Sequence, residues 1–189
     1  MNAKAILKPA IALFAICLVA TVLLALTNSV TTEKIDAIAA ETENTARFAV
    51  FPEAASFSDG KTVGEYTYYE ALDASGKVIG YTFSTAAKGY GGDVSIMTGV
   101  RADGTINGIE VLDVSNETPG LGQNAKKDSF KEQFVGRSGE LGVSTASKAA
   151  ENGIDALTGA TYTSKGVASA VNLALTLFTE IPKGGADIG

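Results

Sequence analysis

Residues 93–114, with the sequence DVSIMTGVRADGTINGIEVLDV, decide the fold class of this chain. Every second residue from Val94 to Val100 is apolar or β-branched, and this period of two predicts a half-buried strand. Asp103-Gly104 predicts a hairpin turn, and Ile106–Val114 predicts the return strand. Because strands joined by a hairpin are antiparallel, we expect a mainly antiparallel sheet.

Two further strands are predicted upstream of this hairpin. Tyr66–Leu72 is rich in aromatic residues, Val78–Ser84 has the composition of a strand, and residues 73–76 predict the turn between them. The glycine-rich residues 88–92 predict a flexible break before the next strand. The sheet is therefore expected to consist of sequential hairpins.

Helices are predicted on the C-terminal side of the sheet. Phe130 and Phe134 are four residues apart, which predicts one face of a short helix within residues 125–136. Residues 137–153 look irregular. Lys165–Glu180 has a broad apolar face and predicts a buried helix, which the following proline and glycines end. The predicted class is α+β, with a mainly antiparallel sheet and flanking helices.

An uncharged apolar run from Ala10 to Leu26 predicts a membrane anchor. With the next two residues it approaches the ~20 residues that cross a bilayer core. Lys4 and Lys8 precede the run and acidic residues follow it, so the positive-inside rule places the N-terminus in the cytoplasm. A cleaved signal peptide is the alternative, but its apolar core is normally ~7–15 residues and a small-residue cleavage site follows it.

Helical spacing continues after the apolar run, over residues 31–48, and Phe51-Pro52 predicts the end of that helix. The expected organisation is a cytoplasmic N-terminus (1–9), a transmembrane helix (10–28), a juxtamembrane helix (29–52), an extracytoplasmic domain (53–182) and a C-terminal tail (183–189).

The composition excludes several classes of function. The chain has 15 Lys and Arg against 21 Asp and Glu, a net charge of -6, which argues against a nucleic-acid surface. It has no histidine and a single cysteine, Cys17, so we expect no metal site, no internal disulfide and no self-contained iron–sulfur cluster. Any redox chemistry therefore requires an organic cofactor.

Residues 155–164, DALTGATYTS, directly precede the predicted buried helix. Thr163 or Ser164 is the predicted N-cap, and the free N–H groups and dipole of a helix N-terminus favour a phosphate there. Gly159 and Ala160 are small enough for a phosphorylated ligand to approach the backbone. Hydroxyl residues before a helix are mostly ordinary caps, so this interpretation remains open on the residues alone.

The segment Asp155–Thr161 resembles the covalent flavinylation motif D-x-x-[ST]-G-A-T of the FMN-binding domain family. This resemblance implies that Thr161 carries FMN through a phosphoester bond, which a flavin transferase forms with FAD as donor. It also implies that the transferase reads Asp155, Thr158, Gly159 and Ala160.

A second resemblance covers most of the chain. Gly89-Tyr90-Gly91-Gly92 and the segment Glu117–Gly122, ETPGLG, are similar to segments of the G subunits of Rnf electron-transport complexes. The resemblance implies a membrane-anchored flavoprotein subunit of a ferredoxin:NAD oxidoreductase, in which covalent FMN relays electrons and redox drives ion translocation. Other subunits would supply NAD binding, iron–sulfur clusters and the ion path, so the chain is part of a translocase and not catalytically complete alone.

Beside a flavin, Leu121 would pack on the ring, Glu117 would position the loop or the flavin, and the loop glycines would admit the ring to the backbone. Tyr162 follows the attachment residue, whereas Tyr90 either lines the site or packs in the core. The expected cofactor-binding residues are Thr161, Asp155, Thr158, Gly159, Ala160, Tyr162, Glu117, Thr118, Gly120, Leu121 and Gly122.

Three alternatives remain open at the level of sequence. The chain is also similar to the C subunits of sodium-translocating NADH:quinone oxidoreductases, which are typically longer. A stand-alone extracytoplasmic FMN carrier is the second alternative. In the third alternative it is an anchored binding or scaffold module without a cofactor, in which Thr161 is only a helix cap.

Overall fold

The computed structural model describes residues 3–145, 148, 150 and 152–182, and the chain divides into two units, Met1–Thr42 and Glu43–Gly189. Helix α1 (Ala3–Val50) is continuous through the predicted juxtamembrane segment and ends one residue before Phe51-Pro52, as predicted. The tail 183–189 lies outside the described residues.

The first unit contains a candidate membrane-spanning segment, Pro9–Ser29, with a mean hydropathy of 2.7. Within it Thr21 donates its hydroxyl to the carbonyl of Cys17 at 2.8 Å, and Thr27 donates to that of Leu23 at 2.9 Å. Returning a hydroxyl to the preceding turn satisfies it without water, which the interior of a bilayer requires.

The second unit is built on an antiparallel sheet in the order β1-β3-β4-β5-β6, with β2 also paired to β3. The predicted hairpins are confirmed, although β4 continues four residues beyond the predicted strand. The six strands are β1 (Ser56–Phe57), β2 (Lys61–Val63), β3 (Tyr66–Leu72), β4 (Val78–Lys88), β5 (Asp93–Arg101) and β6 (Ile106–Asp113).

Aspartates close two of the hairpins by local hydrogen bonds. The carboxylate of Asp73 accepts the backbone N–H of Ser75 at 2.8 Å, and that of Asp103 accepts the N–H of Thr105 at 2.9 Å. Gly76 (φ +80°) and Gly104 (φ +88°) supply the left-handed conformation that each turn needs. The two turns were predictable because their determinants are adjacent in sequence.

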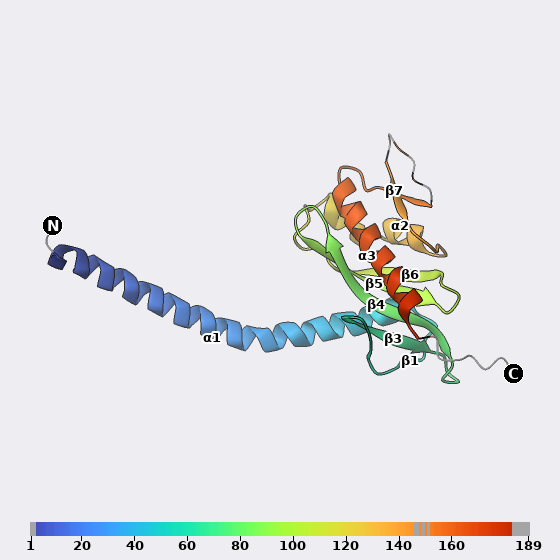
Figure 1. Ribbon diagram of the computed structural model, residues 1–189, viewed down its shortest axis with the longest axis horizontal. Coiled ribbons are helices and arrows are strands. Elements are labelled where there is room, and N and C mark those ends of the chain that lie inside the picture. The colour runs from blue at the N-terminus through green and yellow to red at the C-terminus, as the bar shows by residue number, and fades with distance from the viewer. Residues whose placement is uncertain (1–2, 146–147, 149, 151, 183–189) are drawn as a thin grey trace. The chain divides into compact units, whose positions relative to one another are not determined.

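One face of the sheet is covered by α3 (Thr161–Glu180), which crosses β4 and β5 (Figure 1). Val167 and Val171 of α3 are fully buried with Ile96 and Phe83 of the sheet. This packing presents the N-terminus of α3 at the end of the sheet where β4 turns into β5, because the Cα of Gly89 lies 3.1 Å from where a Cβ on Gly166 would stand.

The predicted helix in residues 125–136 is present only as short pieces, α2 (Asp128–Lys131) between two 3₁₀ turns at 122–126 and 132–134. Phe130 and Phe134 nevertheless lie together, with ring centroids 5.6 Å apart, and both are buried.

The opposite face of the sheet is covered by the last turn of α1 and the residue after it. Phe51 is completely buried against Gly80 and Gly99, and the side-chain amide of Asn107 donates to the carbonyl of Val50 at 2.6 Å. As a result β5 is buried on both faces from Ile96 to Val100, and the prediction of a half-buried strand was wrong. A period-two pattern does not reveal a second covering layer.

Two other predictions need correction. Helix α3 begins at Thr161 with Ala160 as its N-cap, so Thr163 and Ser164 lie in its first turn and neither is the cap. Residues 137–153 are not wholly irregular, because β7 (Gly142–Ser144) pairs in parallel with β8 (Gly153–Asp155). Residues 146, 147, 149 and 151 of that prediction lie outside the described part of the chain.

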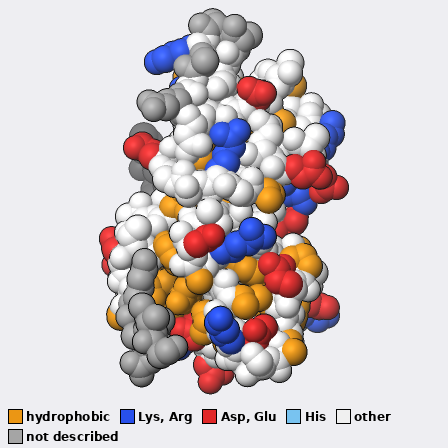
Figure 2. Space-filling view, turned by 90° about the vertical axis from the view of Figure 1, so that its right-hand side faces the viewer, with side chains coloured by type: hydrophobic (Ala, Val, Ile, Leu, Met, Phe, Trp, Pro, Cys, Tyr) orange, Lys and Arg blue, Asp and Glu red, His pale blue; other side chains and the backbone are white. Residues whose placement is uncertain are grey.

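Charged side chains of both signs are interspersed on the face drawn in Figure 2, and hydrophobic side chains gather in its lower half. Among the described ion pairs, Lys61 lies 2.7 Å from Glu70 and Lys131 lies 2.7 Å from Glu110. A nucleic-acid surface typically carries a continuous basic stripe instead. That the chain binds no nucleic acid stays a prediction.

Candidate functional site

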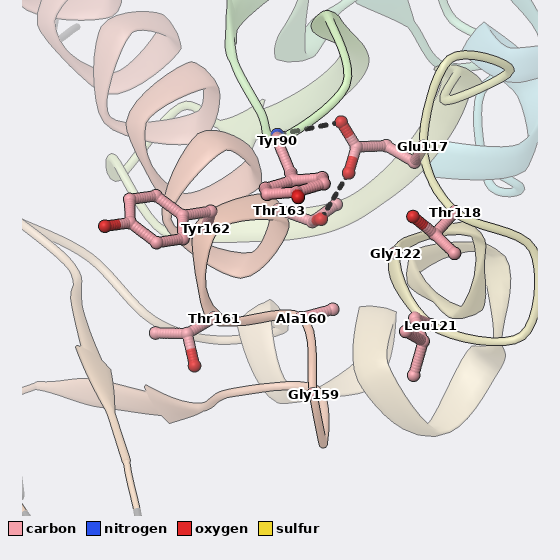
Figure 3. Close-up of a pocket in the computed structure, with 10 residues that line it drawn as sticks. All are labelled: Tyr90, Glu117, Thr118, Leu121, Gly122, Gly159, Ala160, Thr161, Tyr162 and Thr163. Atoms are coloured by element: carbon pink, nitrogen blue, oxygen red, sulfur yellow. Dashed lines mark hydrogen bonds between the residues drawn. The ribbon is translucent and has the colours of Figure 1, made fainter.

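Three segments that are distant in sequence line one cavity of about 290 Å³ (Figure 3). The turn between β4 and β5, the loop after β6 and the entry into α3 each contribute side chains. The lining residues are Tyr90, Glu117, Thr118, Leu121, Gly122, Gly159, Ala160, Thr161, Tyr162 and Thr163.

The carboxylate of Glu117 joins these segments. Its side chain is buried, at 2% exposure. Oε1 accepts the backbone N–H groups of Tyr90 and Gly91, each at 2.9 Å, and Oε2 accepts the hydroxyl of Thr163 in a short hydrogen bond (Figure 3). One carboxylate therefore holds the β4–β5 turn and α3 against its own loop.

Hydrogen bonding favours the ionised form of Glu117. Burial acts to raise the pKa of this carboxyl, but the hydrogen bonds from Thr163 and the backbone N–H groups of Gly91, Tyr90 and Gly92 together bring the pKa below its ordinary value. In the described part of the chain no Lys or Arg lies within ion-pair distance of it. The charge is compensated by neutral donors alone.

Glycines in two of the segments make room for this carboxylate. A Cβ on Gly89 would stand 2.5 Å from Oε1 of Glu117, and one on Gly122 would stand 2.6 Å from Oε2. A Cβ on Gly91 would stand 1.9 Å from the carbonyl oxygen of Asn116. These glycines are thus explained by packing within the chain, and their admission of a flavin ring stays a prediction.

The rim of the cavity is aromatic and apolar. Tyr90 is 73% exposed, Tyr162 is 69% exposed, and their ring centroids lie 6.5 Å apart. Leu121 projects from the opposite wall in Figure 3 and is 41% exposed. Tyr90 is therefore a site residue and not a core residue.

Thr161 is the first residue of α3 and is half-buried. The N–H groups of a first helical turn have no intrahelical acceptor, and the helix dipole adds partial positive charge there. The turn that leads into α3 is held by Ser164, whose Oγ accepts the N–H of Leu157 at 2.9 Å and donates to the carbonyl of Ala160 at 3.0 Å. Gly159 adopts φ +74° in this turn.

Gly159 and Thr161 also line a second cavity, of about 520 Å³, whose wall carries Asp155 and Thr158. The structure therefore places eight of the eleven predicted residues at the first cavity, and the second cavity adds Asp155 and Thr158. Gly120, with φ +77°, lines neither of these two cavities.

Two lining residues are not among the eleven expected ones, although for Tyr90 a position lining the site was left open. Thr163 was assigned to a helix cap, because nothing local indicates that its partner is 46 residues away. Tyr90 could have been included from its position between glycines, which leave a large side chain few neighbours. No group of three metal-ligating side chains occurs among the described residues.

Two protein families match the chain. The FMN-binding domain matches residues 89–176, which include the lining of the first cavity, and the RnfG N-terminal region matches residues 1–49.

Two solved structures are similar in fold to part of this chain. The C subunit of the Na(+)-translocating NADH-quinone reductase from Parabacteroides distasonis has a TM-score of 0.52 at 26% identity, over 61% of each chain. NqrC from Shewanella oneidensis has a TM-score of 0.53 at 21% identity, over 68% of this chain and 71% of that one, and shows the fold alone.

Relatives that match over almost the whole length settle the family. The G subunit of the Na(+)-translocating ferredoxin:NAD(+) oxidoreductase complex of Acetobacterium woodii is 37% identical, covering 95% of each chain. The G subunit of the ion-translocating oxidoreductase complex of Methanosarcina acetivorans is 34% identical, covering 92% of this chain and 95% of that one. This chain therefore belongs to the family of G subunits of Rnf-type ion-translocating oxidoreductase complexes.

Proposed function

We propose that this chain is the membrane-anchored flavoprotein subunit of an ion-translocating ferredoxin:NAD oxidoreductase, and that it relays electrons through FMN attached to Thr161. The observation that carries the proposal is the position of Thr161. This residue lines the cavity at the first turn of α3, within the segment that matches the FMN-binding domain.

The residues of the cavity fit a flavin with a phosphate. Tyr90, Tyr162 and Leu121 offer an apolar and aromatic surface to the ring, as sites for planar ligands do. No Lys or Arg is among the lining residues, so the phosphate charge would be met by the N-terminus of the 20-residue α3. The volume of about 290 Å³ is close to the lower end of ligand pockets, ~300 Å³, so part of the flavin would remain at the surface.

Attachment requires the Thr161 hydroxyl as a nucleophile. Its oxygen forms a bond to the flavin-bearing phosphorus of FAD, the pyrophosphate bond breaks, AMP leaves, and the hydroxyl proton passes to a base of the transferase. Asp155 and Thr158 line the second cavity together with Thr161. A flavin transferase would read the motif from that cavity, where Gly159 adds no side chain, whereas the buried Ala160 lines the first cavity.

When bound, FMN supplies the electron chemistry. The chain orients it by Thr161 at the helix terminus and by the rim formed by Tyr90, Tyr162 and Leu121. A covalent bond also prevents loss of the cofactor from an extracytoplasmic domain. Neither role needs a substrate pocket, and the remaining subunits of the complex would supply the donor, the acceptor and the ion path.

The membrane topology is part of the proposal. The candidate span Pro9–Ser29 is preceded by Lys4 and Lys8, so the N-terminus would remain in the cytoplasm and the FMN-binding domain would face the periplasmic side.

The alternatives have less support. Likeness to the C subunits of NADH-quinone reductases covers 61% of the chain in the solved structure from Parabacteroides distasonis, against 95% for the G subunit of Acetobacterium woodii. A stand-alone FMN carrier would use the same site without those partners. The binding-module alternative treats Thr161 as a helix cap, but the N-cap is Ala160.

The test is an SDS gel of the full chain, co-expressed with a flavin transferase and viewed under ultraviolet light before staining. We expect a fluorescent band for the wild type and for Thr176→Ala, an exposed threonine of the same helix, and none for Thr161→Ala. Fluorescence that survives in Thr161→Ala would move the attachment to Thr158, Thr163 or Ser164. A dark wild-type band beside a fluorescent flavinylated control would refute the electron-carrier function.

A further inference from the structure

Glu117 is a buried negative charge in the wall of the cavity that also exposes Thr161. Burying a carboxylate costs several kcal/mol unless its lone pairs are satisfied. Here the lone pairs are satisfied by the backbone N–H groups of Tyr90 and Gly91 and the hydroxyl of Thr163. A neutral glutamine could join the same three segments without that cost. Joining the three segments therefore does not by itself explain why this residue carries a negative charge.

We propose that Glu117 lowers the reduction potential of the flavin by placing an ionised carboxylate in the wall of its cavity. This inference rests on the proposed function, because it requires FMN on Thr161. It goes further because it gives Glu117 the role of tuning the cofactor. The hydrogen bonds of Glu117 are made within its own chain, so the role is neither contact with the cofactor nor its attachment.

The physical basis is the interaction of a fixed charge with an added electron. A negative charge in a region of low dielectric disfavours reduction of a nearby group, and charge close to the ring is one of the ways in which a protein tunes a flavin. In the described part of the chain no cation pairs with Glu117 to cancel its field. The cavity lining carries no other charged side chain.

Thr163 acts in the opposite sense. Its hydroxyl points its positive end at Oε2 of Glu117 and offsets part of the charge. Replacing Thr163 by valine keeps the shape of the side chain and removes that donor. The backbone donors of Tyr90 and Gly91 remain, so we expect the carboxylate to stay ionised but to be less compensated.

The experiment compares Glu117→Gln and Thr163→Val by spectroelectrochemical titration of the flavin on the full chain in detergent, after co-expression with a flavin transferase. Glutamine can accept the N–H groups of Tyr90 and Gly91 and donate to the Thr163 hydroxyl. We expect Glu117→Gln to raise the reduction potential of the flavin by at least about 30 mV. This shift corresponds to a tenfold change in the two-electron equilibrium constant. We expect Thr163→Val to lower the potential, and Asp59→Asn, at an exposed carboxyl, to leave it unchanged.

Opposite shifts from two variants that touch the same hydrogen bond support a role of the charge. Shifts in the same direction, or an unchanged or lower potential in Glu117→Gln, would overturn the proposal. If Glu117→Gln does not take up flavin, the direction of the potential shift in Thr163→Val decides. If neither variant takes up flavin, the proposal is also overturned, because Glu117 and Thr163 are then needed to form the flavin site. The ultraviolet gel of the wild type reports separately on the proposed function.

Discussion

The side-chain oxygen of Ser164 accepts a hydrogen bond from the backbone N–H of Leu157 at 2.9 Å. Ser164 is completely buried, and its hydroxyl also donates to the carbonyl of Ala160. The turn that contains the proposed flavinylation motif, residues 155–161, is thus tied to the first turn of α3 by a residue that lies beyond the motif.

Replacing Ser164 by alanine should loosen this turn. The substitution leaves the N–H of Leu157 without its acceptor, a loss we expect to cost about 1–3 kcal/mol of unfolding free energy. Flavin incorporation should fall with it, because Thr161 is no longer presented in one conformation. Chemical denaturation and in-gel fluorescence per mole of protein measure the two effects. Ser169→Ala, at an exposed position of the same helix, is the control, and equal yields in both variants would contradict this role.

Stability should depend on pH through Glu117. Its pKa is lower in the folded chain than the ordinary value of 4.5, so the folded state binds fewer protons. The contribution is therefore fully present above about pH 4.5 and is lost as the pH falls through the folded pKa. We expect the midpoint of thermal unfolding to fall less steeply with acid in Glu117→Gln than in the wild type. Identical acid slopes would show that folding does not lower the pKa of Glu117.

Gly80 should not tolerate a side chain. A Cβ there would stand 2.3 Å from the ring of Phe51 and 2.7 Å from the carbonyl oxygen of Val100. We expect Gly80→Ala to lower the free energy of unfolding by about 1–3 kcal/mol through overpacking. Gly108→Ala is the matched control, because its Cβ would meet Val50 at an ordinary 3.5 Å. Urea unfolding measures both, and equal stabilities would disprove the close packing of Phe51.

The rim tyrosines should shield the flavin without affecting its attachment. If Tyr90 and Tyr162 flank the ring, truncating both to alanine exposes it to solvent. We expect unchanged in-gel fluorescence but stronger collisional quenching by iodide in the native protein. Val135→Ala, at an exposed apolar position outside the cavity lining, should leave quenching unchanged. Unaltered quenching in the double variant would place the ring elsewhere.

The orientation of the domain can be tested with one cysteine, because Cys17 is the only one in the chain. In a Cys17→Ser background, Ala74→Cys places a thiol in the exposed β3–β4 turn. We expect a membrane-impermeant maleimide to label it from the periplasmic side, and to label Asn2→Cys only after the membrane is disrupted. The reverse pattern would put the domain in the cytoplasm.

The hairpins were predictable because their determinants are local. Asp73 and Asp103 bind backbone groups within four residues, and period-two alternation marks the strands between them. The start of α3 was predicted four residues late for a different reason. Thr163 and Ser164 look like caps in sequence, but their hydroxyls bond to Glu117 and Leu157, and only the folded chain brings these partners together.

The residues of the candidate site that belong to a motif could be predicted from the sequence. The contacts that tertiary packing forms between them could not. The residues of the motif and the loop Glu117–Gly122 were found by resemblance, which contains no information on their distances. That Glu117 is saturated by hydrogen bonds depends on the β4–β5 turn, 26 residues upstream at Gly91. Likewise, the pairing of β7 with β8 joins three-residue strands, which are too short for a detectable period.

The burial of Phe51 has a consequence for how a soluble form of this protein should be made. A truncation at the predicted boundary of residue 53 would remove Val50 and Phe51, which are 1% and 0% exposed. The glycines that they cover would then be exposed to water, together with an apolar strip of the sheet. An exposed apolar strip favours aggregation. A fragment that begins at Glu43 keeps the last turns of α1 with the sheet and discards the candidate membrane span. The membrane anchor can therefore be removed, provided that the cut leaves Val50, Phe51 and the preceding turns of α1 attached to the sheet.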